Sequence, residues 1–455
     1  MPQDKLSANS QEFAEQAASQ MQGRPIAAAG VPERPTLASG VRPVGELRDT
    51  GFKDRQWLIR RGDEFIQVTE LLYRLAEQAN GERTLEEIAA ALTESTDWMV
   101  TADNVRMLIQ LKLIPAGLII PADGSVTTHS HEWVRSPLAV NLRTRVIGPR
   151  IIDPIAKVLQ VLYTPLVLIP VLVTVAIAHV WLYIVHGVAD SVLEVLYTPG
   201  LFLVALAIML VAAIFHEFGH ASALRYGGGK ARGMGVGLYL IYPAFYTNTT
   251  DSYRLGRRAR VRTDLGGFYF YLIFALGIMG LYLATGQEFL LLIVLLINLD
   301  IIYQCLPFVR FDGYWALADL TGVPDFFSQM GAFLRSVLPL RRWKGAKLPN
   351  LKPWVKAVFA LYIVVTVPVL ALLLFRFITG LPGIAAVIWD SLLLQARGFS
   401  YALDEGDLFG MAASGTQAFI LMLQTLGILY LLYALGGRLL GGILRRSARI
   451  YHGTT

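Results

Sequence analysis

Cysteine is almost absent from this chain, since Cys305 is the only one in 455 residues. A single cysteine excludes an internal disulfide and any zinc site built from several thiolates. Charged residues are also scarce, at 16% of the chain, and there are only 7 histidines. A metal site in this protein must therefore be made from a small stock of histidines and carboxylates.

The beginning of the chain lacks the long apolar run of a secretory signal peptide. Residues 1–45 are rich in Gln, Ala, Ser, Pro and Gly, and such a composition offers little apolar surface to offset the entropy lost on ordering. We predict a disordered tail over 1–45. We also expect this end of the chain to stay on the side of the membrane where it is synthesised.

Long apolar runs, in contrast, are abundant. Hydrophobic residues make up 54% of the chain and the mean hydropathy is +0.49. A transmembrane helix needs about 20 mostly apolar residues. The segments that reach this length are approximately 159–186, 199–224, 265–285, 289–309, 355–378 and 416–440. The predicted fold class is therefore a polytopic α-helical membrane protein with about six transmembrane helices, and the shorter apolar segment 382–395 is expected at the interface or re-entering the membrane.

Basic residues gather in alternate loops between these segments. The first such loop carries Lys230, Arg232, Arg254, Arg257, Arg258, Arg260 and Arg262. Positive residues near span ends mark the cytoplasmic side, which predicts a multi-pass protein of the cell (inner) membrane with both termini cytoplasmic. The arginines between 257 and 262 are interpreted as topology determinants. The net charge of +6 then indicates contact with anionic lipid, and not with nucleic acid.

Residues 46–120 have the pattern of a small soluble domain. Short β-like runs at 56–59 and 64–68 flank a turn, and helices are expected after Thr69, after Thr84 and from about Asp103. Thr84-Leu85-Glu86-Glu87 has the form of a capping box. A final strand over 113–120 would complete a winged-helix-like α+β domain. The remaining predicted parts are a basic linker over 121–157, a transmembrane domain over 158–441 and a basic cytoplasmic tail over 442–455.

A metal-binding pattern ends the second apolar run. His216-Glu217-x-x-His220 follows fifteen uninterrupted apolar residues. Residues four apart share a helix face, so both imidazoles can bind one Zn²⁺ ion, and Glu217 beside them can act as the general base of a metalloprotease. Ionisable groups are costly inside an apolar span, which favours a functional site. A structural zinc site without catalysis is the alternative.

A third metal ligand is needed, and no other histidine lies close in sequence. Asp312 is favoured, because it lies at the cytoplasmic end of the fourth span, on the side where His216 and His220 end the second. Pro307 can break the helix there and let the segment bend inward. Asp300, an acid within the same span, is the rival ligand.

At these residues the chain resembles the site-2 protease family of intramembrane zinc metalloproteases. The resemblance rests on His216-Glu217-x-x-His220 and on Phe311-Asp312-Gly313-Tyr314-Trp315, and it covers roughly 199–325. It implies that His216, His220 and Asp312 bind Zn²⁺ and that Glu217 is the general base.

The chain departs from the family's Asn-Pro-Asp-Gly form, because Val309-Arg310-Phe311 precede the aspartate. This departure puts in doubt the asparagine that would hold substrate, and it leaves Asn248 and Asn298 as candidates. The resemblance also implies that the segment 235–251 forms a strand pair beside the metal. An interfacial loop anchored by tyrosines is the alternative for that segment.

The soluble domain at 46–120 resembles the PqqD-like domains, which bind leader peptides of ribosomally made peptide natural products. The matching residues are Val68-Thr69-Glu70-Leu71-Leu72 and Gly81-Glu82-Arg83-Thr84-Leu85-Glu86-Glu87-Ile88. The resemblance implies a peptide partner, which would add as a strand to the edge of the hairpin. A generic winged helix with a structural or DNA-binding role is the alternative, although the third helix carries no basic stripe.

These features together predict a zinc metalloprotease that cuts peptide bonds at the cytoplasmic side of the membrane. In the leading hypothesis it matures a ribosomally made peptide whose leader is held by the front domain, as the peptide zinc metalloproteases of peptide-maturation clusters are expected to do. Regulated intramembrane proteolysis of a single-span signalling protein is a second hypothesis. A peptide-export or immunity component without catalysis is a third.

Overall fold

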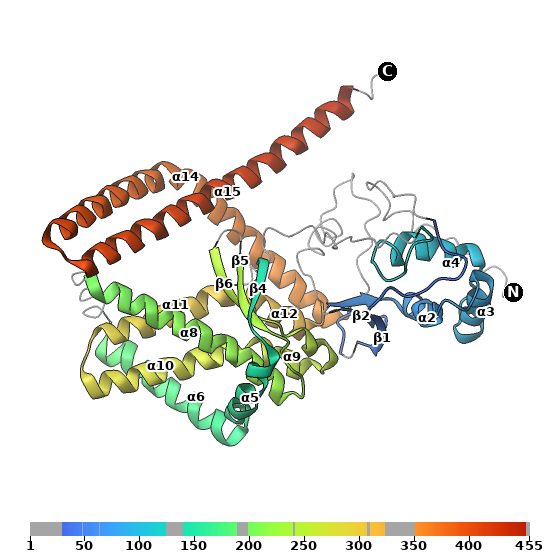
Figure 1. Cartoon of the computed structure of the whole chain (residues 1–455), viewed down its shortest axis with the longest axis horizontal. Coiled ribbons are helices and arrows are strands. Elements are labelled where there is room, and N and C mark those ends of the chain that lie inside the picture. The colour runs from blue at the N-terminus through green and yellow to red at the C-terminus, as the bar shows by residue number, and fades with distance from the viewer. Residues whose placement is uncertain are drawn as a thin grey trace. The chain divides into compact units, whose positions relative to one another are not determined.

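The chain divides into two compact units, Met1–Val134 and Arg135–Thr455, and each is described by itself. The computed structural model describes residues 30–47, 49–62, 64–123, 140–188, 199–239, 242–306, 310–323 and 351–451. Figure 1 shows their helices and strands. The predicted tail therefore lies outside the described residues over 1–29, as do the segment 324–350 and the last four residues of the chain.

The first unit contains an antiparallel sheet with three helices after it. The strands are β1 (Val41–Glu46), β2 (Trp57–Arg61) and β3 (Glu64–Val68), in the order β1-β2-β3. β2 and β3 form a hairpin in which Trp57 pairs with Val68 and Ile59 with Ile66. Gly62 lies in the turn with a φ of 58°, which only glycine adopts without strain. The strand pair predicted from the alternating pattern is therefore present.

The first two helices of this unit begin after Thr69 and Thr84 as predicted, and the third begins at Ala102, one residue before the predicted start at about Asp103. They are α2 (Glu70–Gln78), α3 (Leu85–Ser95) and α4 (Ala102–Leu108), followed by the π-helical turn η1 (Ile109–Leu113). The Thr84 hydroxyl accepts a hydrogen bond from the Glu87 amide, and the Glu87 carboxylate accepts one from the Thr84 amide. This capping box satisfies two amide groups that have no partner within the helix. Ile59, Leu75 and Ile88 are fully buried and lie in the core of the unit.

Two parts of the first unit differ from the prediction. The run 113–120 is not a strand: Leu113 ends the π-helical turn, and only Ile119 makes a single bridge, to Leu37. Leu113 and Leu118 are buried in the core, so the apolar run packs as a helix end and a turn at Gly117. Residues 30–45 were expected in the tail, yet β1 begins at Val41 because its backbone completes the sheet beside β2.

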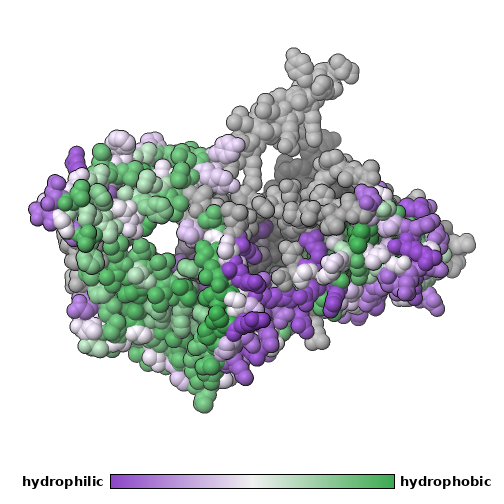
Figure 2. Space-filling view, viewed as in Figure 1, coloured by the Kyte–Doolittle hydropathy of each residue, from purple (hydrophilic) through white to green (hydrophobic). Residues whose placement is uncertain are grey.

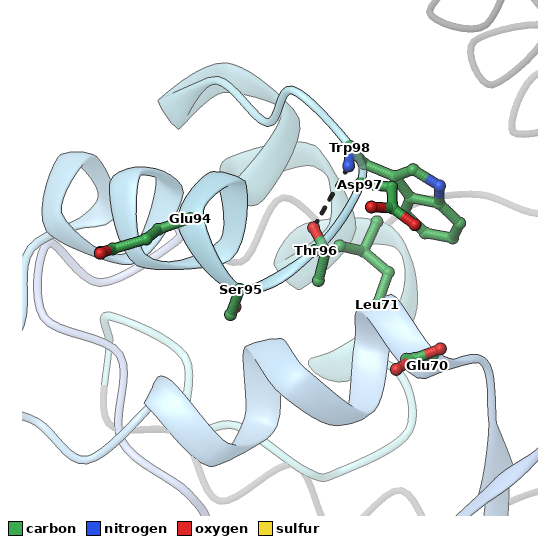
Figure 3. Close-up of a pocket in the computed structure, with 7 residues that line it drawn as sticks. All are labelled: Glu70, Leu71, Glu94, Ser95, Thr96, Asp97 and Trp98. Atoms are coloured by element: carbon green, nitrogen blue, oxygen red, sulfur yellow. Dashed lines mark hydrogen bonds between the residues drawn. The ribbon is translucent and has the colours of Figure 1, made fainter.

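A hollow with a volume of about 400 Å³ opens at the end of α3 in the first unit (Figure 3). The residues that line it are Glu70, Leu71, Glu94, Ser95, Thr96, Asp97 and Trp98. Trp98 is 42% exposed there. The lining contains three carboxylates and no histidine or cysteine, so it is unlike the metal site predicted from the sequence.

The second unit is mostly helical. Its helices are α5 (Pro149–Leu159), α6 (Pro165–Val180), α8 (Pro199–Tyr226), α9 (Arg257–Asp264), α10 (Gly266–Thr285), α11 (Phe289–Cys305), α12 (Asp312–Thr321), α14 (Pro353–Glu405) and α15 (Leu408–Tyr451). Shorter helical turns are η2 (Gln160–Tyr163), η3 (Trp181–His186) and η4 (Thr250–Arg254). Its strands are β4 (Val140–Ile147), β5 (Met234–Tyr239) and β6 (Tyr242–Thr247), paired in that order as one antiparallel sheet.

Five described helices are long and apolar enough to cross a membrane. They are Pro165–His186, Leu201–Tyr226, Gly266–Thr285, Pro353–Glu405 and Leu408–Tyr430. α11 is equally apolar but has only 17 residues. Apolar side chains cover the visible surface of these helices (Figure 2), and many are exposed, Leu166 at 86% and Leu283 at 74%. A surface of this kind is suited to hydrocarbon and not to water.

The two C-terminal helices differ from the prediction. The segments 355–378 and 382–395 were expected to be separate, but both lie in α14, which has 53 residues and contains Pro368 and Pro382. Neighbouring helices and local adjustments allow proline inside membrane helices, so neither proline ends it. α15 likewise continues through the predicted tail to Tyr451. Gly406 ends α14 in the left-handed conformation, and α15 returns along it (Figure 1).

The predicted basic linker is structured in its second half. β4 and α5 occupy 140–159, where only a linker was expected. β4 pairs with β5, so Val140 lies opposite Tyr239 and Arg145 opposite Gly235. The basic residues of this segment predicted a linker. A strand here was not predicted, because the partner strand β5 is distant in the sequence and strand formation depends on that partner.

Helices α8 and α10 cross at two glycines. A Cβ atom on Gly219 would lie 2.3 Å from the Gly266 carbonyl oxygen. Any larger residue at this position would therefore force the two backbones apart. The buried Tyr163 hydroxyl lies 2.9 Å from the Gly219 carbonyl oxygen and 3.2 Å from that of Gly266. This crossing sets the distance between α8 and the first turn of α10.

Candidate metal centre

Helix α8 presents both histidines of the pattern on one face. His216 and His220 are buried, and their ring centroids are 4.8 Å apart. The Nε2 atoms of the two rings lie 3.0 Å from each other. The helical spacing of four residues is responsible for this approach, because such residues are neighbours on the helix surface.

Asp312 joins the two histidines from a different helix. It is the first residue of α12. Its Oδ2 atom lies 2.9 Å from His216 Nε2 and 3.0 Å from His220 Nε2. Among the described residues, these three side chains form the one group that could hold a metal ion. The structure thus brings together the three residues that the sequence put forward as ligands.

The donor atoms of this group suit a cation. His220 Nδ1 lies 2.8 Å from the Thr263 carbonyl oxygen, which can only accept a hydrogen bond. In the neutral ring Nδ1 therefore carries the proton, and Nε2 directs a lone pair at His216 and Asp312. Three electron-rich atoms within 3.0 Å of one another need a shared proton or a metal ion between them. Two imidazoles and a carboxylate are a ligand set that Zn²⁺ accepts in catalytic sites.

The backbone leaves room beside the donor atoms. A Cβ atom on Gly267, in the first turn of α10, would lie 2.3 Å from His216 Nε2 and 2.6 Å from His220 Nε2. Only glycine fits there. The three side chains His216, His220 and Asp312 and the space left by Gly267 therefore fit a bound metal ion.

Asp312 is in the form that binds a metal. Burial acts to raise the pKa of its carboxyl. When the three side chains share a proton, the positive charge of His220 and the hydrogen bonds from both histidines outweigh burial and hold the pKa below its ordinary value. The group is therefore a carboxylate near neutral pH.

The two histidines are held in different ways. His220 is oriented by its hydrogen bond to Thr263, as described above. His216 Nδ1 is buried with no hydrogen-bond partner among the described residues. Its ring instead packs against Tyr271, with centroids 4.4 Å apart, and against Phe268 at 6.2 Å.

Glu217 is fixed by the strand β6. Its Oε2 atom accepts a hydrogen bond of 2.6 Å from the Thr247 hydroxyl, which lies 3.1 Å from the Glu217 carbonyl oxygen as well. Thr247 is the last residue of β6. One oxygen of the Glu217 carboxylate is therefore held by β6, and its role as a general base stays a prediction.

The segment 235–251 is largely strand. β5 and β6 form an antiparallel hairpin in which Met234 pairs with Thr247 and Tyr239 with Tyr242. The strand pair implied by the resemblance is thus present, and the interfacial loop considered as its alternative is not.

Asp300 does not lie in the group of donor atoms. Its carboxylate accepts a hydrogen bond of 2.9 Å from Gln304 and a further one from Tyr271. Asp312 is brought to the histidines because α11 ends at Cys305 and a new helix begins at Asp312. Gly313 allows this helix start to pack closely on the end of α11, because a Cβ atom there would lie 2.6 Å from the backbone of Cys305.

The two candidate asparagines lie in different surroundings. Asn248 follows Thr247 directly, and its side-chain oxygen accepts hydrogen bonds from the amide and the hydroxyl of Thr250. Asn298 bonds to His179 at 3.1 Å and to Tyr183 at 2.8 Å, in a network between α11 and the first apolar helix. Neither of these hydrogen bonds reaches His216 or His220, so a role of either asparagine in holding substrate stays a prediction.

Sequence reasoning missed four residues that shape this centre: Thr247, Thr263, Gly267 and Tyr163. Thr263 and Thr247 are ordinary loop threonines in the sequence, with no local signal. The pair Gly266-Gly267 at the start of an apolar run was a usable signal, because small residues mark close helix contacts in membranes.

Among curated proteins, the chain is similar to "Putative peptide zinc metalloprotease protein YydH" of Bacillus subtilis (strain 168). The two are 24% identical over 116 residues, which are 25% of this chain and 46% of the relative. The match thus spans less than half of the relative's length. No family model matches the chain, and no solved structure matches it.

Proposed function

We propose that this protein is a membrane-embedded zinc metalloprotease of the site-2 protease type, which hydrolyses peptide bonds at the cytoplasmic side of the membrane. The observation that carries the proposal is the convergence of donor atoms of His216, His220 and Asp312 within 3.0 Å of one another. The similarity to a relative named as a peptide zinc metalloprotease supports it. The apolar helices support the membrane location.

Each side chain has a defined task in this proposal. His216, His220 and Asp312 hold the zinc ion, which supplies Lewis-acid chemistry: it polarises a carbonyl oxygen and makes water more acidic. Glu217 accepts the proton of the attacking water and passes it to the departing amine. The Thr247 hydroxyl keeps the Glu217 carboxylate turned toward the reacting group. Thr263 keeps His220 in the tautomer that binds metal.

The sheet offers a place for an extended substrate. Among the described strands β6 has a partner on one side only, β5. A peptide that added to its other side would be held by main-chain hydrogen bonds. Since β6 ends at Thr247, which bonds Glu217, that peptide would run toward the general base. A protease needs its scissile bond extended, and the strand edge provides this conformation.

The first unit would hold the leader of the substrate. Its sheet has strand edges at β1 and β3, where a leader peptide could add as a further strand. This part of the proposal rests on the resemblance of 46–120 to PqqD-like domains. It makes the substrate a ribosomally made peptide, and not the membrane helix of a signalling protein.

Metal analysis of the detergent-purified chain tests the site first. We expect one zinc ion per chain in the wild type and none in His216→Ala or Asp312→Ala. Zinc that persisted in Asp312→Ala would move the third ligand elsewhere. A chain that took up no zinc after reconstitution would contradict the protease proposal and favour a peptide-export or immunity role.

Cleavage of a precursor peptide tests the chemistry. Glu217→Gln keeps the shape of the side chain and removes the base, so we expect zinc to remain and the rate to fall by about 10²–10⁴-fold. Equal cleavage by wild type and Glu217→Gln would refute the assigned role. Loss of cleavage on removing residues 30–123, with an unrelated peptide still cut, would support the leader-binding role.

A further inference from the structure

Four arginines lie on the short helix α9, and one of them is unlike the others. Arg260 is 2% exposed, whereas Arg258, two residues earlier, is exposed. Burial of a guanidinium is costly unless it is paired and hydrogen-bonded. A topology determinant should reach the lipid headgroups, and the Arg260 side chain is not placed to do so.

The Arg260 guanidinium bonds to a second helix. Its Nε donates to Asp319 Oδ1 at 3.1 Å, and its Nη1 donates to the Leu255 carbonyl oxygen at 3.0 Å. Asp319 is 18% exposed at its side chain. The bond to Asp319 therefore anchors α9 to α12, and the bond to the Leu255 carbonyl fixes the orientation of the guanidinium.

Asp319 belongs to the helix that begins with the third ligand of the metal centre. It follows Asp312 by seven residues on α12, which is close to two helical turns, so the two carboxylates lie on the same face. A shift or rotation of α12 at Asp319 would be transmitted to Asp312. The Arg260–Asp319 pair thus restrains the position of Asp312.

The same helix α9 also orients the second histidine. Thr263 follows Arg260 by three residues on α9. Its backbone carbonyl oxygen accepts the hydrogen bond from His220 Nδ1 at 2.8 Å. One short helix is therefore bonded to His220 through Thr263 and to the Asp312 helix through Arg260.

A second acid lies beside this ion pair. Asp264, the last residue of α9, forms a side-chain hydrogen bond with Asp319, and burial together with the charge of Asp319 raises the pKa of Asp264 well above its ordinary value. The end of α9 therefore makes a further contact with the same residue of α12.

We propose that Arg260 is a positioning residue for the metal centre: through Asp319 it holds α12, and with it Asp312, against the α9 helix that orients His220. The inference rests on the proposed zinc site and adds to it a residue outside the ligand set. It predicts that loss of the Arg260–Asp319 pair weakens zinc binding even though neither residue contacts the metal.

The test compares Arg260→Gln with Arg258→Gln in the full-length, detergent-purified protein. Both changes remove one positive charge from the same helix, so they affect membrane topology alike. Zinc affinity is measured by competition with a chromophoric chelator, and ligand geometry by the absorption spectrum of the Co²⁺-substituted protein. We expect Arg260→Gln to lower the zinc affinity by about 10–100-fold and to alter the Co²⁺ spectrum, with Arg258→Gln like the wild type.

Two further variants guard against a simple folding defect. Asp319→Asn is nearly isosteric and removes the charge at the other end of the pair, and we expect the same loss of zinc affinity. Arg260→Lys keeps the charge but not the two-point geometry, so its affinity should lie between those of wild type and Arg260→Gln. Thermal unfolding of the metal-free proteins shows that each variant is folded.

The outcomes separate this inference from the proposed function. Wild-type zinc affinity in folded Arg260→Gln and Asp319→Asn would overturn the positioning role and leave the zinc site intact. Equal losses in Arg258→Gln and Arg260→Gln would overturn it too, because total charge would then be the cause. A wild type that binds no zinc would overturn the proposed function, and this inference with it.

Discussion

Gly267→Ala places a single methyl group inside the proposed metal centre. A Cβ atom at this position would lie 2.3 Å from Cε1 and Nε2 of His216 and 2.6 Å from Nε2 of His220. Ordinary contacts of a Cβ atom begin at 3.4 Å. The His216 ring would therefore have to withdraw by about 1 Å, whereas ligand distances in metal sites tolerate only about 0.2 Å.

We expect this change to lower zinc affinity by at least about 100-fold, which corresponds to about 2.8 kcal/mol. The methyl group cannot escape by rotation, because it is attached directly to the backbone. The metal-free protein should still fold, since the His216 ring can move when no metal constrains it. Zinc content after purification and chelator competition measure the loss.

Gly277→Ala and Gly280→Ala are matched controls on the same helix. A Cβ atom at either position would meet nothing within 4 Å. Both variants should bind zinc like the wild type, with a helix stability that is unchanged or higher by up to about 1 kcal/mol. Full zinc affinity in Gly267→Ala would refute the geometry of the centre described above.

Three further predictions follow from other contacts. Thr247→Val removes the hydroxyl that bonds Glu217. A hydrogen bond to a charged group contributes about 1.5–3 kcal/mol, so we expect peptide cleavage to slow by about 10–100-fold with zinc content unchanged. An unaltered rate would contradict the role of that bond. Asp300→Asn should retain one zinc ion per chain by elemental analysis, because Asp300 bonds Gln304 outside the donor group; zinc loss would make Asp300 a ligand again. Thr84→Ala should lower the stability of α3 by about 1 kcal/mol, seen as faster amide hydrogen exchange over 85–95, and protection equal to wild type would argue against the capping box.

The sequence alone predicted helices suited to a membrane and the two histidines, His216 and His220, of the proposed metal site. Long apolar runs require a hydrocarbon environment whatever their partners are, so helices suited to a membrane could be predicted from composition. The spacing of His216 and His220 needs only one helix to bring the two rings together. Capping at Thr84 is equally local, and its hydrogen bonds lie within four residues.

Segment boundaries that depend on packing were not determined in this way. The segment 382–395 was expected to be separate from the span 355–378, but α14 continues through both, because a helix in such surroundings has few other ways to satisfy its backbone. β4 was read as a linker, since the strand β5 that completes it lies about 90 residues later. The run 113–120 was read as a strand, since a short apolar run does not show whether it packs as strand or helix end.

Only the tertiary structure showed which side chains lie together in the proposed metal centre. Asp312 and Asp300 are both acids near the end of one apolar run, and the choice between them depends on where α11 stops and α12 begins. Thr247, Thr263 and Gly267 act on residues that lie 30 to 51 positions earlier in the chain, as in the 2.8 Å bond from His220 to Thr263. Arg260 resembles its neighbours in the sequence and differs from them only in burial. Contacts between distant segments leave no periodic pattern, so the fold had to bring these side chains together before their roles could be inferred.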